Sequence, residues 1–303
     1  MKIAAILMVL AVFGLAFLYV TRSKSVLSRT NILVGTSPLS VWSWNKSDGS
    51  ITLILLPSDI ASDSSQYGRY SLEALWKLGF IDGASGAALA KSLTNTLAMP
   101  LYLFIGEGDG LTPTADPKEY GQQTFSLSGA MSFLLGRRRT NIPWQTYARF
   151  SWALSSVLRD TVDVIDLANR LPVANETLPD GTKRQFFDIA QVDVLLEGRF
   201  EDEKIRKEGH TVAIYNTTTT PALGTYAARL LNRQGVLVVA VGNSEPQIEE
   251  CRVEASEAIL ESSTAKIISE LFTCQLAPSE SQERADILVR LGSAYASQFA
   301  SVL

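Results

Sequence analysis

Apolar residues form one long run near the start of the chain and many short runs after it. The long run covers residues 3–20 and ends at the polar, basic segment Thr21-Arg22-Ser23-Lys24. A helix over residues 3–20 would be about 27 Å long, close to the ~30 Å hydrocarbon thickness of a bilayer. Bulky residues follow the run where a signal-peptide cleavage site needs small ones. The pattern therefore predicts an N-terminal transmembrane helix, with residues 1–28 as an uncleaved membrane anchor.

After the anchor, short apolar runs alternate with stripes of helical period. Runs typical of strands lie at residues 31–35, 51–56, 101–105 and 192–196. Helical patterns lie at residues 70–79, 84–98 and 144–170. Asp48-Gly49, between the first two strands, marks a hairpin turn. This alternation predicts a middle domain at residues 29–198, an α/β sandwich with a mixed sheet.

A charged segment separates this domain from the rest of the chain. Residues 199–210 are rich in charge and poor in large apolar side chains, which is typical of a linker. Beyond it, strands are predicted at residues 211–215, 236–241 and 285–291, with helices at 221–235 and 263–272. Thr220 is the expected N-cap of the first helix, with Pro221 at its first position. Residues 211–303 are thus predicted to form a small separate α/β C-terminal domain.

Composition narrows the chemistry. Lys and Arg number 27 against 31 Asp and Glu, so the formal net charge is −4, which argues against a dedicated nucleic-acid binder. His210 is the single histidine and there are two cysteines, so zinc sites with several histidines and iron–sulfur clusters are excluded. Phosphate-loop and dinucleotide-binding glycine motifs are absent from the sequence. The remaining chemistry must use carboxylates, arginines, lysines, hydroxyls or a bound metal.

The C-terminal region carries short motifs in a definite order. They are Thr211-Val212-Ala213-Ile214-Tyr215-Asn216, Leu223-Gly224, Leu230-Leu231-Asn232-Arg233-Gln234-Gly235, Val238-Val239-Ala240-Val241-Gly242-Asn243 and Ala285-Asp286-Ile287-Leu288-Val289-Arg290-Leu291-Gly292. In this order and spacing they resemble the LytR C-terminal domain of the LytR-CpsA-Psr family of bacterial cell-envelope proteins. The resemblance implies an N-terminal anchor, an extracytoplasmic catalytic domain and a separate C-terminal domain.

The middle region resembles the catalytic domain of the same family. The matching segments are Leu53-Ile54-Leu55-Leu56-Pro57-Ser58-Asp59, residues 127–139 with their closing Arg137-Arg138-Arg139, and Tyr147-Ala148-Arg149. Family members are phosphotransferases that move a glycopolymer from a polyprenyl pyrophosphate carrier onto peptidoglycan. The resemblance implies that Asp59 is a ligand of Mg²⁺ and that Arg137, Arg139 and Arg149 hold phosphate. Guanidinium groups and Mg²⁺ both suit pyrophosphate oxygens.

The sequence also departs from the family pattern. Ser58 stands where an arginine is expected, residues 40–44 lack the expected acidic residue, and Ser151-Trp152 replaces an Arg-Gln pair. Two functions therefore stay open: a divergent or weakly active phosphotransferase, and a non-catalytic envelope protein that binds glycan, lipid carrier or a partner enzyme. Structural roles stay open as well. Asp59 fits a turn or cap, and the arginines fit a solvated helix end or a surface ion pair.

The resemblance places the body of the protein outside the cytoplasm, attached to the cell membrane by its single N-terminal helix. The expected partners are the membrane and a polyprenyl-linked glycan or peptidoglycan, with no nucleic acid. Cys251 and Cys274 lie in one domain of a chain expected to be exported, which favours a disulfide between them. Two separate buried thiols are the alternative.

Overall fold

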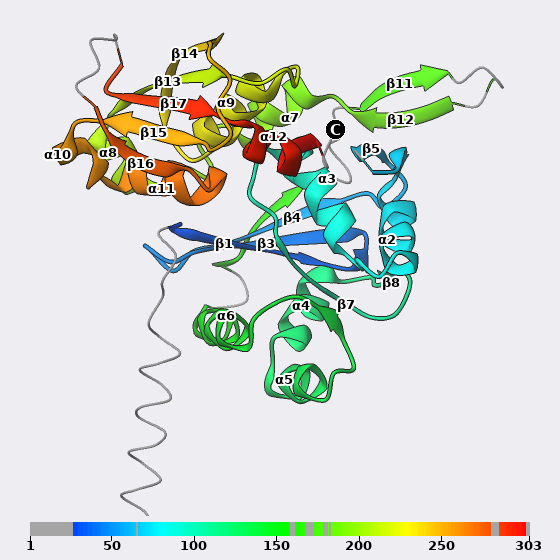
Figure 1. Ribbon diagram of the computed structural model, residues 1–303. Helices are drawn as coiled ribbons and strands as arrows, with labels where there is room; N and C mark the ends of the chain where they lie inside the picture. The colour runs from blue at the N-terminus through cyan, green and yellow to red at the C-terminus, as the bar shows by residue number, and fades with distance from the viewer. Residues whose placement is uncertain are drawn as a thin grey trace, which may run out of the picture.

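The computed structural model describes residues 27–64, 66–157, 161–167, 173–177, 181, 183–279 and 285–300 (Figure 1). The apolar run at residues 3–20 lies outside these ranges. Within them, no helix is both long enough and apolar enough to cross a membrane. The described chain is a mixed α/β structure with several sheets.

A mixed sheet forms the centre of the middle domain. Among the described residues it has six strands in the order β10-β4-β3-β1-β7-β9. These are β10 (Asp163–Asp166), β4 (Ile51–Leu56), β3 (Leu39–Asn45), β1 (Arg29–Val34), β7 (Leu103–Gly106) and β9 (Arg139–Thr140). Strand β1 is antiparallel to β3, with Arg29 opposite Asn45 and Val34 opposite Ser40, and parallel to β7. The predicted hairpin joins β3 to β4, where the Asn45 N–H donates to the Ser50 carbonyl.

Helices cover both faces of this sheet (Figure 1). One face packs against α2 (Leu72–Ile81), α3 (Ala87–Leu97) and α7 (Ile189–Leu196), and the other against α4 (Pro117–Thr124), α5 (Leu127–Leu134) and α6 (Trp144–Ser156). Side chains alternate between the faces along a strand. Accordingly Leu33 packs with the first group, whereas its neighbours Ile32 and Val34 pack with the second. The predicted mixed α/β fold is therefore confirmed for this part of the chain.

Two glycines allow α2 to pack over the carboxyl ends of the strands. The Trp76 ring of α2 is fully buried. A Cβ atom added to Gly35, after β1, would lie 2.7 Å from this ring, and one added to Gly106, at the end of β7, would lie 2.5 Å from it. Such distances are shorter than carbon atoms tolerate, so these positions need glycine for the ring to sit where it does.

Smaller sheets flank the main one. Four strands pair in the order β11-β12-β5-β6 within the described ranges. They are β11 (Val173–Thr177), β12 (Lys183–Phe187), β5 (Ala61–Ser64) and β6 (Gly68–Ser71). A short parallel pair joins β2 (Thr36–Ser37) to β8 (Thr112–Pro113). The first of these sheets matters for function because it forms one wall of a cleft.

The C-terminal domain has its own sheet and core. In the described residues its five strands lie in the order β14-β13-β17-β15-β16. They are β14 (Leu237–Asn243), β13 (Thr211–Asn216), β17 (Ile287–Leu291), β15 (Arg252–Ala255) and β16 (Gln275–Pro278). The helices are α8 (Glu203–Glu208), α9 (Leu223–Arg233), α10 (Glu257–Leu260), α11 (Ser263–Phe272) and α12 (Ser293–Ala300). Cys251 and Cys274 are joined in a disulfide, with their Cα atoms 4.4 Å apart.

Two predicted elements of the middle domain are wrong. Helix α6 ends at Ser156 instead of continuing to residue 170, and residues 163–166 form β10, which pairs parallel to β4. Residues 189–196 form α7 instead of the predicted strand at 192–196. The Asp188 side chain accepts a hydrogen bond from the Gln191 N–H and caps this helix, which buries Val192 and Leu196 one turn apart. Residues 163–166 form a strand because they pair with β4, and residues 189–196 form a helix that Asp188 caps, a cap that the sequence analysis did not identify.

The predicted linker and the predicted start of α9 also need correction. Within residues 199–210, Phe200 is buried in the core of the middle domain and Ile205 of α8 is buried in the core of the C-terminal domain. The charged segment is therefore folded, and its charges line the outer side of α8. Helix α9 begins after Ala222, which has a φ of 58°, and no side chain caps it. Thr220 and Pro221 thus precede the helix instead of forming its first turn.

Candidate functional site

The four residues assigned by resemblance do not meet at one site. Asp59 follows the carboxyl end of β4, and Arg139 pairs with Gly106 at the carboxyl end of β7. Four strand spacings separate β4 from β9 in the sheet, which corresponds to roughly 19 Å. Arg149 lies at the other end of the strands, in a cavity that residues Arg29 and Lys46 also line. The length of β1, roughly 17 Å, separates this end from the carboxyl ends of β1, β4 and β7. A single pyrophosphate cannot contact all of these groups.

We call the edge of the main sheet at which β1, β4 and β7 end the carboxyl edge. The arginine that is fixed in place there is Arg138, which the sequence analysis did not select as a phosphate ligand. Its side chain is 11% exposed and lies 3.2 Å from the Glu107 carboxylate. It also donates to the Thr124 hydroxyl over 3.1 Å, and its guanidinium lies 5.8 Å from the centre of the Tyr120 ring. Arg137 and Arg139 are exposed, and the Arg139 guanidinium lies over the ring of Phe80. The best-positioned cation of this edge is thus already neutralised by a carboxylate.

At the end of β4, Ser58 stands where the family pattern has an arginine, and Asp59 follows it. The Ser58 hydroxyl lies 2.8 Å from the Ser37 hydroxyl, so a neutral hydrogen bond occupies this position. Asp59 is exposed. Within the described residues no three histidine, cysteine, aspartate or glutamate side chains are close enough to hold a metal ion. Magnesium is usually held by only one or two carboxylates together with substrate phosphates, so the role of Asp59 as a Mg²⁺ ligand stays a prediction.

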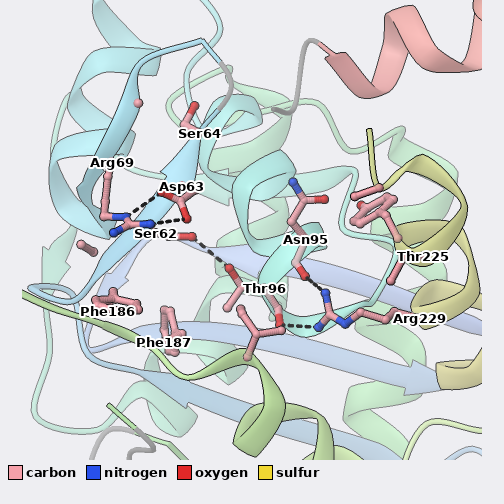
Figure 2. A pocket seen from close by; sticks show the side chains of 15 residues that line it. Ser62, Asp63, Ser64, Arg69, Asn95, Thr96, Phe186, Phe187, Thr225 and Arg229 are labelled. Atoms are coloured by element: carbon pink, nitrogen blue, oxygen red, sulfur yellow. Dashed lines mark hydrogen bonds and ion pairs between the residues drawn. The ribbon is translucent and has the colours of Figure 1, made fainter. Parts of the chain in front are cut away.

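A cleft between the two domains is the more developed site. It encloses about 640 Å³ between the small sheet, helix α3 and helix α9 (Figure 2). Its walls combine aromatic rings, hydroxyl groups, an amide and charged groups. The members that carry the argument are Asp63, Arg69, Asn95, Phe186, Tyr226 and Arg229. The cleft size is within the range of small-ligand sites.

One end of the cleft is a fixed aromatic and charged surface. Asp63 and Arg69 face each other across the β5–β6 hairpin and form two hydrogen bonds, of 2.7 and 3.1 Å (Figure 2). Glu176 accepts a third bond from Arg69 over 2.9 Å, and the guanidinium lies 4.8 Å from the centre of the Phe186 ring. These hydrogen bonds raise the pKa of Arg69, despite the opposing effect of burial. The side chain stays charged and held in one orientation.

The other end is built by α9 of the C-terminal domain. The Arg229 guanidinium donates to both oxygens of Asp193, over 2.8 and 2.9 Å, and to the Asn95 carbonyl over 2.9 Å. Burial raises the pKa of the nearby Tyr226 phenol, so this group stays protonated and remains a hydrogen-bond donor. Between the two ends, the hydroxyls of Ser62, Ser92 and Thr96 form a buried network.

Electrostatics define which ligand the cleft suits. Arg69 is bonded to two carboxylates, Asp63 and Glu176, whereas Arg229 shares Asp193 with Arg233. Three arginines around the cleft are thus balanced by three carboxylates. The Asp63 side chain is 72% exposed and keeps acceptor capacity. A neutral ligand with many hydroxyls and an apolar ring face fits this mixture better than a phosphate does. Sequence reasoning missed these residues because they come from five separate elements; only the Asp63–Arg69 hairpin pair carries a local signal.

The fold and the cleft define a two-domain α/β protein with a ligand-sized cavity at its domain boundary. Residues 210–295 match the family described as LytR cell envelope-related transcriptional attenuator. The C-terminal domain is therefore a LytR C-terminal domain, and the resemblance to this family is confirmed. A comparison with curated protein sequences gives no match.

Solved structures provide further similarities. TagV of Bacillus subtilis is 10% identical, and the match covers 55% of this chain and 94% of TagV with a TM-score of 0.38. Lin1025 of Listeria innocua is 13% identical and matches over 55% of this chain and 95% of its own, with a TM-score of 0.39. TagT of B. subtilis is 9% identical over 58% of this chain and 91% of its own, with a TM-score of 0.38. TagT has also been solved bound to LIIa-WTA.

Proposed function

We propose that this protein is an envelope protein that binds a glycan in the cleft between its two domains and does not itself transfer glycopolymer. The LytR C-terminal domain supports a role in the cell envelope. The body would then lie outside the cytoplasm, anchored by residues 1–28. Its partners would be the membrane and a polyprenyl-linked glycan or peptidoglycan.

The observation that carries this proposal is the composition of the cleft. A sugar ring has apolar C–H faces, which pack on aromatic rings, and hydroxyls at its rim, which need both donors and acceptors. Phe186 supplies a ring, Asp63 supplies acceptors, and Tyr226 with Asn95 supplies donors around the same 640 Å³ space. Because the three arginines around the cleft are balanced by three carboxylates, the cleft favours a neutral polyol.

The arrangement of the carboxyl edge supports binding over transfer. A phosphotransferase must stabilise charge that develops on pyrophosphate with several positioned cations. Here the Ser58 hydroxyl bonds to Ser37, Arg138 is paired with Glu107, and Arg149 lies at the far edge of the sheet. The residues present do not gather the positive charge that the reaction needs.

Isothermal titration of the full chain with N-acetylglucosamine oligosaccharides and with soluble peptidoglycan fragments tests the proposal. Phe186→Ala should weaken binding about tenfold, because it removes the ring beneath the sugar. Tyr70→Ala is the matched control, since Tyr70 of β6 is 46% exposed in the same four-stranded sheet but does not line the cleft. Equal affinity of wild type and Phe186→Ala would contradict the site.

Two further measurements address the remaining parts of the proposal. A polyprenyl pyrophosphate glycan incubated with the protein and Mg²⁺ should give no transfer to peptidoglycan; transfer at a rate dependent on Asp59 would instead show a phosphotransferase. A reporter that works only outside the cytoplasm should be active when it is fused after Leu303. Activity of a cytoplasm-only reporter at that position would overturn the orientation.

A further inference from the structure

Helices α5 and α6 cover one face of the main sheet and pack against each other (Figure 1). The Phe133 ring of α5 stacks on the Tyr147 ring of α6, with 4.3 Å between the ring centres. Ala130 and Phe133 are the side chains by which α5 packs on the core beneath it. The opposite side of α5 therefore faces away from the sheet.

The outward side of α5 is apolar. Leu127, Met131 and Leu134 are spaced four and three residues apart, which places them on one side of the helix. They are 92%, 59% and 71% exposed. Helix α5 has no charged residue, whereas α4, on the same face of the sheet, exposes Glu119 and Gln123. A helix that is apolar on its outer side as well as on its inner side is typical of a contact with a membrane or another protein.

Helix α6 adds two exposed tryptophans to this layer. Trp144 and Trp152 lie about two turns apart and are 49% and 69% exposed. The single charged residue of this helix, Arg149, is half-buried. Tryptophan is enriched at membrane–water interfaces, because its ring packs against lipid while its N–H reaches polar groups. The composition of the two helices therefore favours a bilayer as the contact.

Charge at the end of α5 favours a bilayer that is anionic. Arg137 and Arg139 directly follow the helix and are exposed. Among the described residues neither forms an ion pair, and Glu107 pairs with Arg138, which lies between them in the sequence. Basic side chains beside an apolar helix surface are attracted to the phosphates of anionic lipids. These two guanidinium groups thus complement a negatively charged membrane surface.

The start of the described chain lies close to the same layer. Leu27 lines a cavity together with Thr146 and Arg149 of α6. The predicted anchor ends at residue 20, and the seven residue steps from there to Leu27 span at most about 24 Å. This length is roughly two helix diameters. An anchor at residues 3–20 therefore holds α6 close to the membrane surface.

We propose that the outward side of α5 and the exposed tryptophans of α6 lie in the headgroup layer of an anionic bilayer. We call this surface the α5–α6 face, which consists of Leu127, Met131, Leu134, Trp144 and Trp152. The proposal rests on the membrane anchoring in the proposed function but not on glycan binding. Helix α3, which borders the interdomain cleft, covers the opposite face of the main sheet, so this orientation turns the cleft away from the lipid.

A fluorescent probe on α5 tests the proposal in the full chain. Because Cys251 and Cys274 are paired, the thiol of Leu134→Cys alone would react with an environment-sensitive nitrobenzoxadiazole label. The labelled protein is reconstituted in vesicles of phosphatidylglycerol and phosphatidylcholine that contain a nitroxide-labelled lipid. Leu237→Cys is the matched control, since Leu237 is 54% exposed on β14 of the C-terminal domain. Quenching of the label at position 134 should exceed that at position 237 at least fivefold.

The other outcomes separate this proposal from the proposed function. Equal quenching at the two positions, with the protein retained in the vesicles, would overturn the α5–α6 face and leave the anchor intact. Protein that is not retained in the vesicles would contradict both the anchor and the face. Leu134→Cys, unlabelled and oxidised in the same vesicles, should stay monomeric. A disulfide-linked dimer would show that a second copy of the chain covers the face instead of lipid.

Further variants separate the apolar contribution from the charged one. Met131→Asp should reduce the quenching at position 134 to the level of the control, because it places a charge in the lipid layer; full quenching in this variant would contradict insertion. Its melting temperature and its oligosaccharide binding should match those of wild type, because Met131 is 59% exposed.

Arg137→Gln combined with Arg139→Gln should reduce the quenching at least twofold in vesicles that contain phosphatidylglycerol and leave it unchanged in phosphatidylcholine alone. Arg252→Gln, at an exposed residue of β15, is the control and should behave as wild type does. An equal effect of the paired variant in both lipids would overturn the preference for an anionic bilayer.

Discussion

The Asp193 carboxylate on α7 lies 2.7 Å from the Arg233 guanidinium on α9, so an ion pair joins the last helix of the middle domain to the C-terminal domain. Arg229 binds the same carboxylate over 2.8 Å. The two arginines also donate to the carbonyls of Asn95, Thr96 and Leu97 in the last turn of α3. Cations at this helix end stabilise carbonyls that have no partner within the helix. The domain boundary, and with it the cleft, is therefore held by the Asp193 carboxylate together with the last turn of α3.

Asp193→Ala should destabilise the protein by about 2–3 kcal/mol. The Arg233 side chain is only 6% exposed, and burial lowers its pKa, so loss of the partner leaves a poorly solvated charge. Urea unfolding measures the change. Lys77→Ala is the control, because its exposed pair with Glu73 contributes only about 0.3–0.5 kcal/mol. A loss below about 1 kcal/mol in Asp193→Ala would show that the boundary does not depend on this pair.

If Arg149 holds phosphate as the family resemblance implies, Ser58→Arg and Arg149→Ala should act independently on polyprenyl phosphate binding. The two residues lie at opposite edges of the main sheet, and changes at distant sites without shared partners are additive to within about 0.5 kcal/mol. Arg149→Ala should weaken binding in the presence of either residue at position 58. A double-mutant cycle with a short-chain polyprenyl phosphate gives the coupling free energy. A coupling above about 1 kcal/mol would mean that both side chains contact one phosphate.

Glu208→Gln should lower stability at neutral pH but have little effect in acid. Glu208 ends α8 and accepts 2.8 Å hydrogen bonds from the Ser263 and Thr264 N–H groups of α11, with a third bond from the Thr264 hydroxyl. Burial opposes ionisation, but these hydrogen bonds outweigh it and lower the pKa of Glu208.

A lowered folded-state pKa means that the stabilisation is present above the ordinary glutamate pKa of about 4.3 and is lost as the pH falls through the lowered value. The expected loss is about 1–2 kcal/mol at pH 7, the effect of a charged helix cap. Thermal unfolding from pH 7 to pH 3 follows it, with exposed Glu250→Gln as the control. A difference between Glu208→Gln and wild type that persists at pH 3 would contradict the mechanism.

The disulfide should stabilise the C-terminal domain by about 3 kcal/mol, because Cys251 and Cys274 close a loop of 23 residues. The paired variant Cys251→Ser with Cys274→Ser should lower the denaturation midpoint accordingly. In the unreduced, denatured protein neither thiol should react with an alkylating reagent. Complete alkylation without reductant would show that the cysteines are not paired.

Local patterns determined much of the secondary structure. The apolar runs of β1, β4 and β13 and the periodic stripes of α2, α3 and α11 form as predicted, since each pattern has a partner face for its apolar side chains. Strand β14 also forms as predicted, although Leu237, Val239 and Val241 are exposed. Residues 163–166 lack such a distinct pattern. They become β10 only because β4 offers an unpaired edge for a parallel strand. The alternation of strands and helices, in turn, was enough to indicate the α/β class.

The sequence by itself determined most of the elements, the α/β class and the resemblance to the LytR C-terminal domain, because these depend on short-range periodicity and on the order of motifs. Only the tertiary structure decided which charged groups meet. It separated Asp59 from Arg139 by four strand spacings and placed Arg149 near Lys46 at the opposite edge of the sheet. It also joined Asp63, Phe186 and Arg229 into one cleft. Strand order and domain packing set these distances, and neither follows from the spacing of residues along the chain.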